Sequence, residues 1–267
     1  EDGHSHLLAG AIPNCRSYDP TFASEVAVIL QHGMQRMLDE QQDEYYYLTL
    51  MNENYTHPDL PEGAAEGVIK GMYLLQSTAE GGTSPPAKSA TSPNGRGRSG
   101  AAASGEGQTK RKSSTPHVQL MGSGTILREV IAAAELLDKD FGVTARIWSC
   151  PSFTELRRDG LAATRYSRLN PEAKTQQKPY ITELLEGRQG PAICATDYVY
   201  AYGDQVRAFV PMDYTVLGTD GFGRSDTRAN LRRHFEVDRY YIAHAAICAL
   251  AKAGKMTPKD ITRAIKQ

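Results

Sequence analysis

The sequence predicts an α/β protein in which a mostly parallel sheet is covered by helices, and two observations lead to this prediction. From residue 117 onward, short β-forming runs alternate with longer segments whose apolar residues recur at helical spacing. Glycines, prolines and capping residues separate these runs at regular intervals. Such alternation is typical of an open, doubly wound sheet with helices on both faces.

Three elements are predicted before residue 77. The run YDPTFASEVAVILQHGMQRMLDE predicts a helix with Asp19 as its N-cap and Pro20 at its first helical position. Its apolar face consists of Phe22, Val26, Ile29, Gly33 and Met37. YYYLTLMNENY (45–55) predicts a strand that runs into a polar turn. PEGAAEGVIKGMYLL (61–75) predicts a short or irregular helix because it contains three glycines.

The composition changes sharply over residues 77–116. This segment consists of Gly, Ser, Pro and Ala with scattered basic residues, and it has almost no aliphatic side chains. It cannot bury enough apolar surface to offset the entropy of ordering, so we expect a disordered, dispensable linker. We interpret its KRK run (110–112) as a solvated charge run rather than a nucleic-acid contact or a protease site.

The alternating elements follow the linker in a regular series. The predicted strands are HVQLMGSG, TARIWSC, GPAICATD and YTVLGTDGFG. The predicted helices are TILREVIAAAELLDKDFG, a helix capped by SFTE, SDTRANLRRHF, DRYYIAHAAICALAKAG and TPKDITRAIKQ. The first of these helices presents Leu127, Val130, Ala134, Leu137 and Phe141 on one face and ends at Gly142.

The overall composition is that of a globular protein. The 267 residues suffice for one large domain or two modest ones. With 40% hydrophobic and 23% charged residues and a formal net charge of -1, the chain does not resemble a dedicated binder of nucleic acid or of anionic membranes. No apolar run approaches the roughly 20 residues of a membrane helix, and no secretion signal opens the chain. We therefore expect a cytoplasmic protein.

Four cysteines are widely spaced and contain no C-x-x-C pair. They are Cys15, Cys150, Cys194 and Cys248. This spacing suggests neither a zinc site nor a disulfide framework. We expect reduced, mostly buried thiols.

The first residues, EDGHSH, bring one carboxylate and two imidazoles together. Asp2, His4 and His6 could share a pocket and handle protons near neutral pH. They could equally be solvated loop residues, the remnant of a tag or ligands of a surface metal. The abrupt polar start also suggests the C-terminal part of a longer protein.

Two glycine-containing turns are further candidates for a site. GSGT (122–125) lies between a strand and a helix, where a phosphate could bind, but it lacks the further glycines of a dinucleotide fingerprint and a Walker lysine, and a tight turn is enough to explain it. GTDGFGRSDTR (218–228) has Asp220 and Arg224 at the carboxyl end of a predicted strand, where open α/β folds place sites. A structural turn or a subunit interface is the alternative for this segment.

Seven segments strongly resemble the C-terminal part of the homodimeric, bacterial-type pyruvate dehydrogenase decarboxylating subunit, a family of the transketolase superfamily. They are EDGHSH, IPNCRSYDP, YYYLTLMNENY, PEGAAEGVIKGMY, GSGTILREV, SFTELRRDG and VLGTDGFGRSDTRANLRRHFEVD. They occur in the order of the family and cover nearly the whole chain except 77–116.

The resemblance implies a domain organisation and a set of site residues. Residues 1–76 would be the C-terminal portion of a pyrimidine-binding domain, 77–116 an insertion, and 117–267 a transketolase-type C-terminal domain. Asp2 and His6 would be catalytic residues beside the substrate, and His4 would be adjacent to it. The family also uses a histidine directly before this run, a position that this chain does not contain.

The resemblance also implies a reaction and its partners. The family decarboxylates pyruvate on thiamine diphosphate and Mg²⁺ and passes an acetyl group to the lipoyl acyltransferase component, working as a homodimer. This chain lacks the Gly-Asp-Gly…Asn magnesium motif and the activating glutamate, so we expect it to bind no cofactor or metal and to be inactive alone. A non-catalytic assembly module and a fragment of a transketolase-like two-carbon transferase are the alternatives.

Overall fold

The computed structural model describes residues 2–78 and 115–266, and the remainder of the predicted linker, 79–114, lies outside the described residues. A two-stranded sheet and a five-stranded sheet form the framework. The first part of the chain contains α1 (Ser5–Gly10), β1 (Cys15–Tyr18), α2 (Ala23–Met34), the π-helical turn η1 (Gln35–Asp39), β2 (Tyr45–Leu48) and α3 (Ala65–Lys70).

The remaining strands are β3 (Tyr73–Ser77), β4 (His117–Gly122), β5 (Thr144–Ser149), β6 (Ala192–Ala195) and β7 (Tyr214–Leu217). The remaining helices are α4 (Ile126–Phe141), α5 (Phe153–Leu169), α6 (Tyr180–Leu185), α7 (Tyr200–Asp204), the 3₁₀ turn η2 (Arg207–Phe209), α8 (Arg228–His234), α9 (Arg239–Lys252) and α10 (Pro258–Ile265). The four strands and five helices predicted after the linker are thus confirmed.

The larger sheet is mostly parallel, as predicted. Its strand order is β3-β5-β4-β6-β7, and only β3 runs antiparallel to its neighbour. The smaller sheet pairs β1 with β2 in parallel. Because β3 extends to Ser77 and the Thr78 N–H donates to the Ala145 carbonyl at 2.9 Å, the first residues of the predicted linker belong to the larger sheet.

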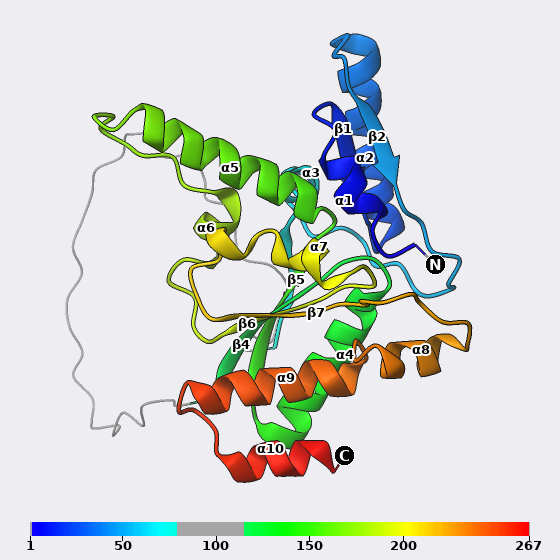
Figure 1. Ribbon diagram of the computed structural model, residues 1–267, viewed down its shortest axis with the longest axis vertical. Coiled ribbons are helices and arrows are strands. Elements are labelled where there is room, and N and C mark those ends of the chain that lie inside the picture. The colour runs from blue at the N-terminus through cyan, green and yellow to red at the C-terminus, as the bar shows by residue number, and fades with distance from the viewer. Residues whose placement is uncertain (1, 79–114, 267) are drawn as a thin grey trace, which may run out of the picture.

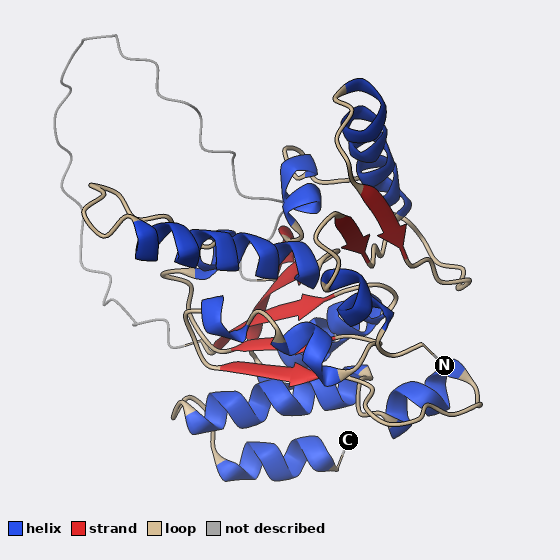
Figure 2. Cartoon of the chain, turned by 45° about the horizontal axis from the view of Figure 1, so that its top comes forward, coloured by secondary structure: helices blue, strands red, loops and turns tan. Residues whose placement is uncertain are grey.

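Two apolar cores lie on opposite faces of the larger sheet. The helices α4 and α9, with α10 beside α9, cover one face, and α5, α6 and α7 cover the other (Figure 1, Figure 2). Successive strand residues point to opposite faces, so Leu120 of β4 packs with Leu127 of α4, whereas Met121 packs in the core that contains Tyr202. Burial on both faces explains why β4 is apolar without alternation.

The start of α2 differs from the prediction. The helix begins at Ala23 with Phe22 as its N-cap, so the prediction that Asp19 is the N-cap is wrong. The Asp19 carboxylate instead accepts hydrogen bonds from the hydroxyls of Thr49 and Ser123. The carboxylate therefore accepts from hydroxyls that are distant in sequence instead of from the backbone N–H groups of the first helical turn, which an N-cap would use.

Glu25 closes the first turn of α2 and is fully buried. Its Oε2 accepts from the N–H groups of Thr21 at 2.6 Å and Phe22 at 2.9 Å. Its Oε1 accepts from the hydroxyls of Tyr73 at 2.8 Å and Ser149 at 2.5 Å. Burial raises the pKa of Glu25, and these donors act against that rise. The carboxylate thus joins α2 to β3 and β5.

Helix ends in the second part of the chain follow local rules. Gly142 ends α4 with a φ of 63°, a left-handed conformation that favours glycine. The Ser152 hydroxyl accepts from the Glu155 N–H at 3.0 Å at the start of α5, as the SFTE motif predicts. Thr257 and Asp260 form the capping box of α10.

Several elements in the first part of the chain are shorter than predicted or are not predicted at all. β2 covers only Tyr45–Leu48 of the strand predicted over 45–55. The helix predicted over 61–75 stops at Gly71, whose φ of 97° turns the chain into β3. The short elements α1, β1 and β3, and α6 and α7 in the second part of the chain, have no clear sequence pattern of their own.

The described residues agree with the predictions about thiols and membrane spans. Cys15, Cys150 and Cys194 are buried free thiols, and Cys248 is partly buried. Within residues 2–78 and 115–266, no helix combines the length and the apolar character needed to cross a membrane.

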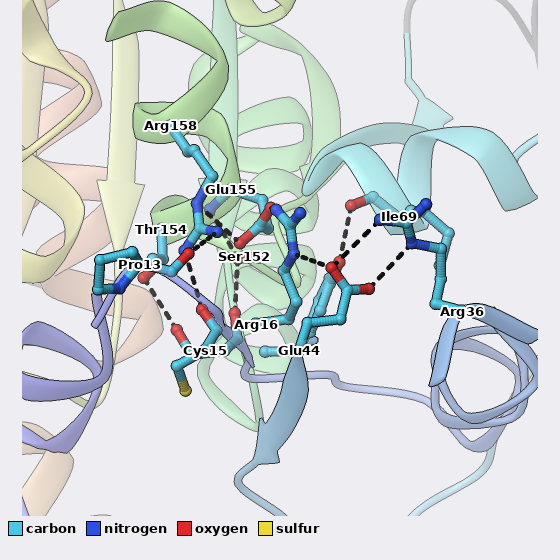
Figure 3. A network of polar contacts seen from close by, with 12 residues as sticks. Pro13, Cys15, Arg16, Arg36, Glu44, Ile69, Ser152, Thr154, Glu155 and Arg158 are labelled. Atoms are coloured by element: carbon cyan, nitrogen blue, oxygen red, sulfur yellow. Dashed lines mark hydrogen bonds and ion pairs between the residues drawn. The ribbon is translucent and has the colours of Figure 1, made fainter. Parts of the chain in front are cut away.

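Ion pairs fasten β1 to α5. Arg16 on β1 pairs with Glu44 (Nε to Oε2, 3.2 Å) and with Glu155 (Nη1 to Oε2, 2.6 Å), as Figure 3 shows. Arg158 of α5 donates to the carbonyl oxygen of Cys15 at 2.8 Å. Desolvation raises the pKa of Glu155, and Arg16 opposes that rise. Arg16 is therefore the cation that makes burial of this carboxylate tolerable.

We expect Arg16→Met to lower the free energy of unfolding by about 1–3 kcal/mol, because it leaves the Glu155 carboxylate buried without its closest cation. Urea unfolding followed by circular dichroism measures this loss. Lys178→Met is the matched control, because the Lys178–Glu186 pair is exposed and such pairs contribute about 0–1 kcal/mol. Equal losses in the two variants would contradict the role assigned to Arg16.

Candidate functional site

The carboxyl ends of parallel strands from both sheets meet around one cleft of about 440 Å³. The residues that follow these strands and line the cleft are Asp19 after β1, Thr49 after β2, Thr125 after β4, Asp197 after β6 and Thr219 after β7. Loops at the carboxyl ends of parallel strands are where open α/β folds place their sites. The cleft is therefore the candidate site.

Asp19 lies buried at the junction of the two sheets. Its Oδ1 accepts from the Thr49 hydroxyl at 2.9 Å, and its Oδ2 accepts from the Ser123 hydroxyl at 2.8 Å. Desolvation is the largest influence on this carboxyl and raises its pKa to about 7, with the nearby Asp197 and Glu25 acting in the same direction. Asp19 can therefore change its charge near neutral pH.

The GSGT turn holds the segment that follows β1. Gly124 has a φ of 51°, and a Cβ at this position would lie 2.6 Å from Asp19 Oδ2. The Gly124 N–H donates to the Asp19 carbonyl at 3.0 Å, and the Thr21 hydroxyl donates to the Gly124 carbonyl at 2.7 Å. The turn thus uses its polar groups in tertiary contacts, which supports the structural interpretation of this motif.

His6 of α1 is buried beside the cleft. Its Nε2 lies 2.9 Å from Thr49 Oγ1, and its ring stacks on Tyr202 with centroids 4.8 Å apart. Its side chain is 1% exposed, and desolvation lowers its pKa to about 4, although the charge of Asp2 acts in the opposite direction. The imidazole is therefore neutral at physiological pH.

Asp2 and His4 occupy different surroundings from His6. Asp2 lines the cleft, and its Oδ1 accepts from the N–H groups of His4 at 3.3 Å and Ser5 at 3.0 Å. Desolvation acts to raise the pKa of Asp2, but the hydrogen bonds from Ser5 and His4 outweigh it and lower the pKa. His4 is exposed, and neither it nor His6 is among the residues that line the cleft.

The glycine-rich segment 218–228 forms one rim of the cleft. Gly221 and Gly223 line it and have φ values of 104° and 76°, which only glycine adopts readily. Asp220 points elsewhere, since its Oδ1 accepts from the Tyr200 N–H at 2.8 Å. The predicted location at a strand end is confirmed, and Asp220 holds the loop against α7.

Ion pairs fix the wall of the cleft near α8. Glu53 pairs with Arg128 at 2.6 Å and with Arg232 at 2.5 Å. Glu129 pairs with Arg232 at 3.4 Å and with Arg239 at 2.8 Å. Desolvation acts to raise the pKa of both glutamates, but the arginines outweigh it and lower their pKa values. Arg232 thus ties α8 to α4 and to the segment after β2.

Two acidic residues of the cleft, Asp19 and Asp197, are not apparent as site residues from the sequence. Asp197 is the last residue of the predicted strand GPAICATD, so its position at a strand end is a usable signal. Asp19 also follows a strand, but β1 is not predicted and the Asp-Pro pair matches a helix start. Its true environment depends on contacts distant in sequence.

Comparisons with known proteins identify both parts of the chain. Residues 1–58 match the pyruvate dehydrogenase E1 component middle domain, and residues 107–238 match the transketolase-like TK C-terminal domain. The pyruvate dehydrogenase E1 component of Pseudomonas aeruginosa is 52% identical over 266 residues, 99% of this chain. The same component of Escherichia coli (strain K12) is 46% identical over 267 residues, also 99% of this chain.

The chain belongs to the pyruvate dehydrogenase E1 family. It spans 26% of the length of each of these two relatives. The resemblance stated from its motifs is thereby confirmed.

Solved structures place this E1 chain in the transketolase-like fold. Transketolase from Leishmania mexicana gives a TM-score of 0.56 at 15% identity, covering 94% of this chain and 28% of that one. Transketolase from Pichia stipitis, in complex with sedoheptulose 7-phosphate, gives the same score and identity over 96% and 28%. At this identity the likeness shows the fold alone.

The pKa of Asp19 predicts a pH dependence of stability in the E1 chain. Between about pH 4 and pH 7 the folded chain keeps on Asp19 a proton that the unfolded chain releases, so stability falls as the pH rises through this window. Asp19→Asn removes this titration. We expect the variant to gain on the order of 2–4 kcal/mol relative to the wild type between about pH 4 and pH 8.

Urea unfolding of both proteins at each pH measures this gain. Asp43→Asn, at an exposed position, is the control and should keep the pH dependence of the wild type. A difference between Asp19→Asn and the wild type that stays constant across this range would contradict the burial of an ionisable Asp19.

Proposed function

We propose that this chain is the C-terminal part of the thiamine-diphosphate-dependent E1 subunit, which decarboxylates pyruvate and transfers the acetyl group to lipoamide. The observation that carries the proposal is the 52% identity to the P. aeruginosa pyruvate dehydrogenase E1 component across 99% of this chain. The cleft at the strand ends, with Asp2 at its wall and His6 beside it, is consistent with a substrate site.

We assign roles at the substrate to Asp2 and His6. Asp2 is an ionised acceptor at the cleft wall, suited to orienting a substrate or exchanging a proton with it. His6 is neutral and can accept a proton, and it is hydrogen-bonded to Thr49, which lines the cleft. His4 is exposed and adjacent in sequence, and we assign it no direct step.

The described residues do not fit the diphosphate end of the cofactor. Among the described residues that line the cleft, Arg224 is the one basic side chain beside Asp2, Asp19 and Asp197, so the lining offers a single cation to a diphosphate, which carries several negative charges. Among residues 2–78 and 115–266, no group of three His, Cys, Asp or Glu side chains is placed to hold a metal ion. Mg²⁺ with its oxygen ligands holds such diphosphates. We therefore propose that parts of the enzyme outside this chain bind that end.

We also propose that the chain functions in a homodimer and with the lipoyl acyltransferase component. Exposed large apolar side chains gather in the first part of the chain, including Leu30, Met34 and Leu38 of α2 and η1, which are 52%, 61% and 62% exposed. Contiguous exposed apolar surface marks protein contacts. This surface is available to bind the rest of the enzyme.

We expect the isolated chain to bind thiamine diphosphate and Mg²⁺ more weakly than micromolar, and to decarboxylate pyruvate only with the upstream part of a relative. Calorimetry tests the binding, and co-expression with the upstream part of the P. aeruginosa enzyme followed by a decarboxylation assay tests the activity. Micromolar binding by the chain alone would contradict the first expectation. A stable but inactive complex would favour an assembly module, and activity with a sugar-phosphate acceptor would favour a two-carbon transferase.

In the reconstituted enzyme, His6→Ala should lower kcat by roughly 100-fold, the usual scale for loss of a proton-transfer group. His4→Ala is the matched control and should have a much smaller effect, because His4 is exposed, whereas His6 contacts Thr49 of the cleft lining. Steady-state kinetics measure both, and thermal unfolding shows that the variants fold. An unchanged kcat for His6→Ala would reduce His6 to a packing residue.

A further inference from the structure

A continuous chain of hydrogen bonds links His6 to Asp19. His6 Nε2 lies 2.9 Å from Thr49 Oγ1, and the Thr49 hydroxyl donates to Asp19 Oδ1 at 2.9 Å. The three residues come from α1, from the end of β2 and from the end of β1. His6 and Asp19 are 1% and 2% exposed, whereas Thr49 between them is half-buried and lines the cleft.

We infer that Asp19, acting through the Thr49 hydroxyl, selects which ring nitrogen of His6 carries the proton, and is therefore a positioning residue for His6. The catalytic relevance of this inference rests on the proposed function. The hydrogen-bond relation itself concerns only residues of this chain.

The single proton of the Thr49 hydroxyl is the basis of the selection. When Asp19 is ionised, Thr49 donates its proton to the carboxylate and can only accept from His6, so His6 Nε2 must bear the imidazole proton. When Asp19 is protonated, it can donate to Thr49, and Thr49 then donates to Nε2. The imidazole proton then lies on Nδ1. The charge of Asp19 thus sets the direction of both the Asp19–Thr49 and the Thr49–His6 hydrogen bonds.

The Thr49 hydroxyl contacts His6 Nε2, and the phenol of Tyr198 is a further hydrogen-bond neighbour of that hydroxyl. His6 Nδ1 is buried without a hydrogen-bond partner among the described residues. The ring is enclosed by aromatic side chains: it stacks on Tyr202 and meets Tyr198 and Tyr47 edge-on, with centroid distances of 4.5 and 5.4 Å. The Thr49 contact is therefore the polar contact that distinguishes the two tautomers.

Opposing influences act on the ionisation of the Asp19 carboxyl. Ser123 donates to Oδ2, and this bond favours the ionised form. Burial favours the neutral form. The other titratable groups that act on the two residues are Asp197 and Glu25 near Asp19, Asp2 near His6, and the phenols of Tyr47, Tyr198 and Tyr202. These opposing influences leave the pKa of Asp19 at about 7, whereas that of His6 is about 4.

Nitrogen NMR of the full chain with labelled histidine tests the inference, since pyrrole-like and pyridine-like ring nitrogens resonate in separate ranges. The His6→Gln variant identifies the His6 signals. At about pH 9 we expect a pyrrole-like Nε2 in the wild type, and at about pH 5.5 a shift of Nε2 to the pyridine-like range while the ring stays neutral. Asp19→Asn should abolish this pH-dependent shift.

Thr49 variants test the route of the coupling. Thr49→Val should abolish the shift, because it removes the hydroxyl, and Thr49→Ser should retain it. Thr196→Val is the matched control: Thr196 Oγ1 lies 3.3 Å from Ser123 Oγ but is not between Asp19 and His6, so this variant should keep the shift. Unchanged signals from His244 on α9 show that each variant folds.

Two results would overturn the inference: a wild-type tautomer that is the same at both pH values, or a shift that survives in both Thr49→Val and Asp19→Asn. If one variant does not fold, the other decides. These measurements need neither cofactor nor substrate. An inactive reconstituted enzyme with an intact shift would refute the proposed function alone, and an active enzyme without the shift would refute this inference alone.

Discussion

The burial of the Asp19 carboxyl between two sheets is the constraint on which the geometry of the cleft depends. An unpaired polar group in such a position costs several kcal/mol, so its hydrogen bonds must form for the chain to fold. Those bonds come from Thr49 at the end of β2 and Ser123 at the end of β4. Gly124 completes the fit, because a Cβ there would overlap the carboxylate. The ends of β1, β2 and β4 therefore have a single satisfied arrangement.

Other buried charged groups around the cleft likewise join separate elements through contacts that must form. Glu25 joins α2 to β3 and β5 through four donors, and Arg16 joins β1 to α5 through Glu155. Arg232 bridges Glu53 and Glu129 on the opposite wall. Apolar surfaces tolerate small displacements, whereas a satisfied polar network fixes distances and angles. The junction between the two sheets is thus held by directional contacts together with a small apolar cluster, Tyr18, Ile29, Val68 and Tyr73, while the two larger apolar cores lie on the faces of the larger sheet.

Local sequence patterns account for the larger sheet and its helices, but not for the junction. The elements β4, α4 and β5 are long, periodic and capped, so their sequences determine them. The four-residue β1 is too short to show a period, and β3 follows a helical run from which only the left-handed turn at Gly71 separates it. Asp19 matches the local sequence pattern of an N-cap, but its carboxylate instead accepts hydrogen bonds from the distant hydroxyls of Thr49 and Ser123. The contacts that assemble the cleft join residues separated by 30 to 104 positions, a distance at which periodicity carries no information.

The charge of the cleft bears on the substrate that we propose for it. Pyruvate is an anion, and three ionised aspartates at the wall would repel it. Desolvation raises the pKa of Asp19 to about 7 and also raises that of Asp197. A raised pKa lowers the negative charge that each of these carboxyls carries at a given pH, and Arg224, which also lines the cleft, is a cation, while Asp2 remains the ionised acceptor. Acidic groups at the strand ends would repel an anionic substrate if they were fully ionised. Because burial raises the pKa values of Asp19 and Asp197, it weakens that repulsion.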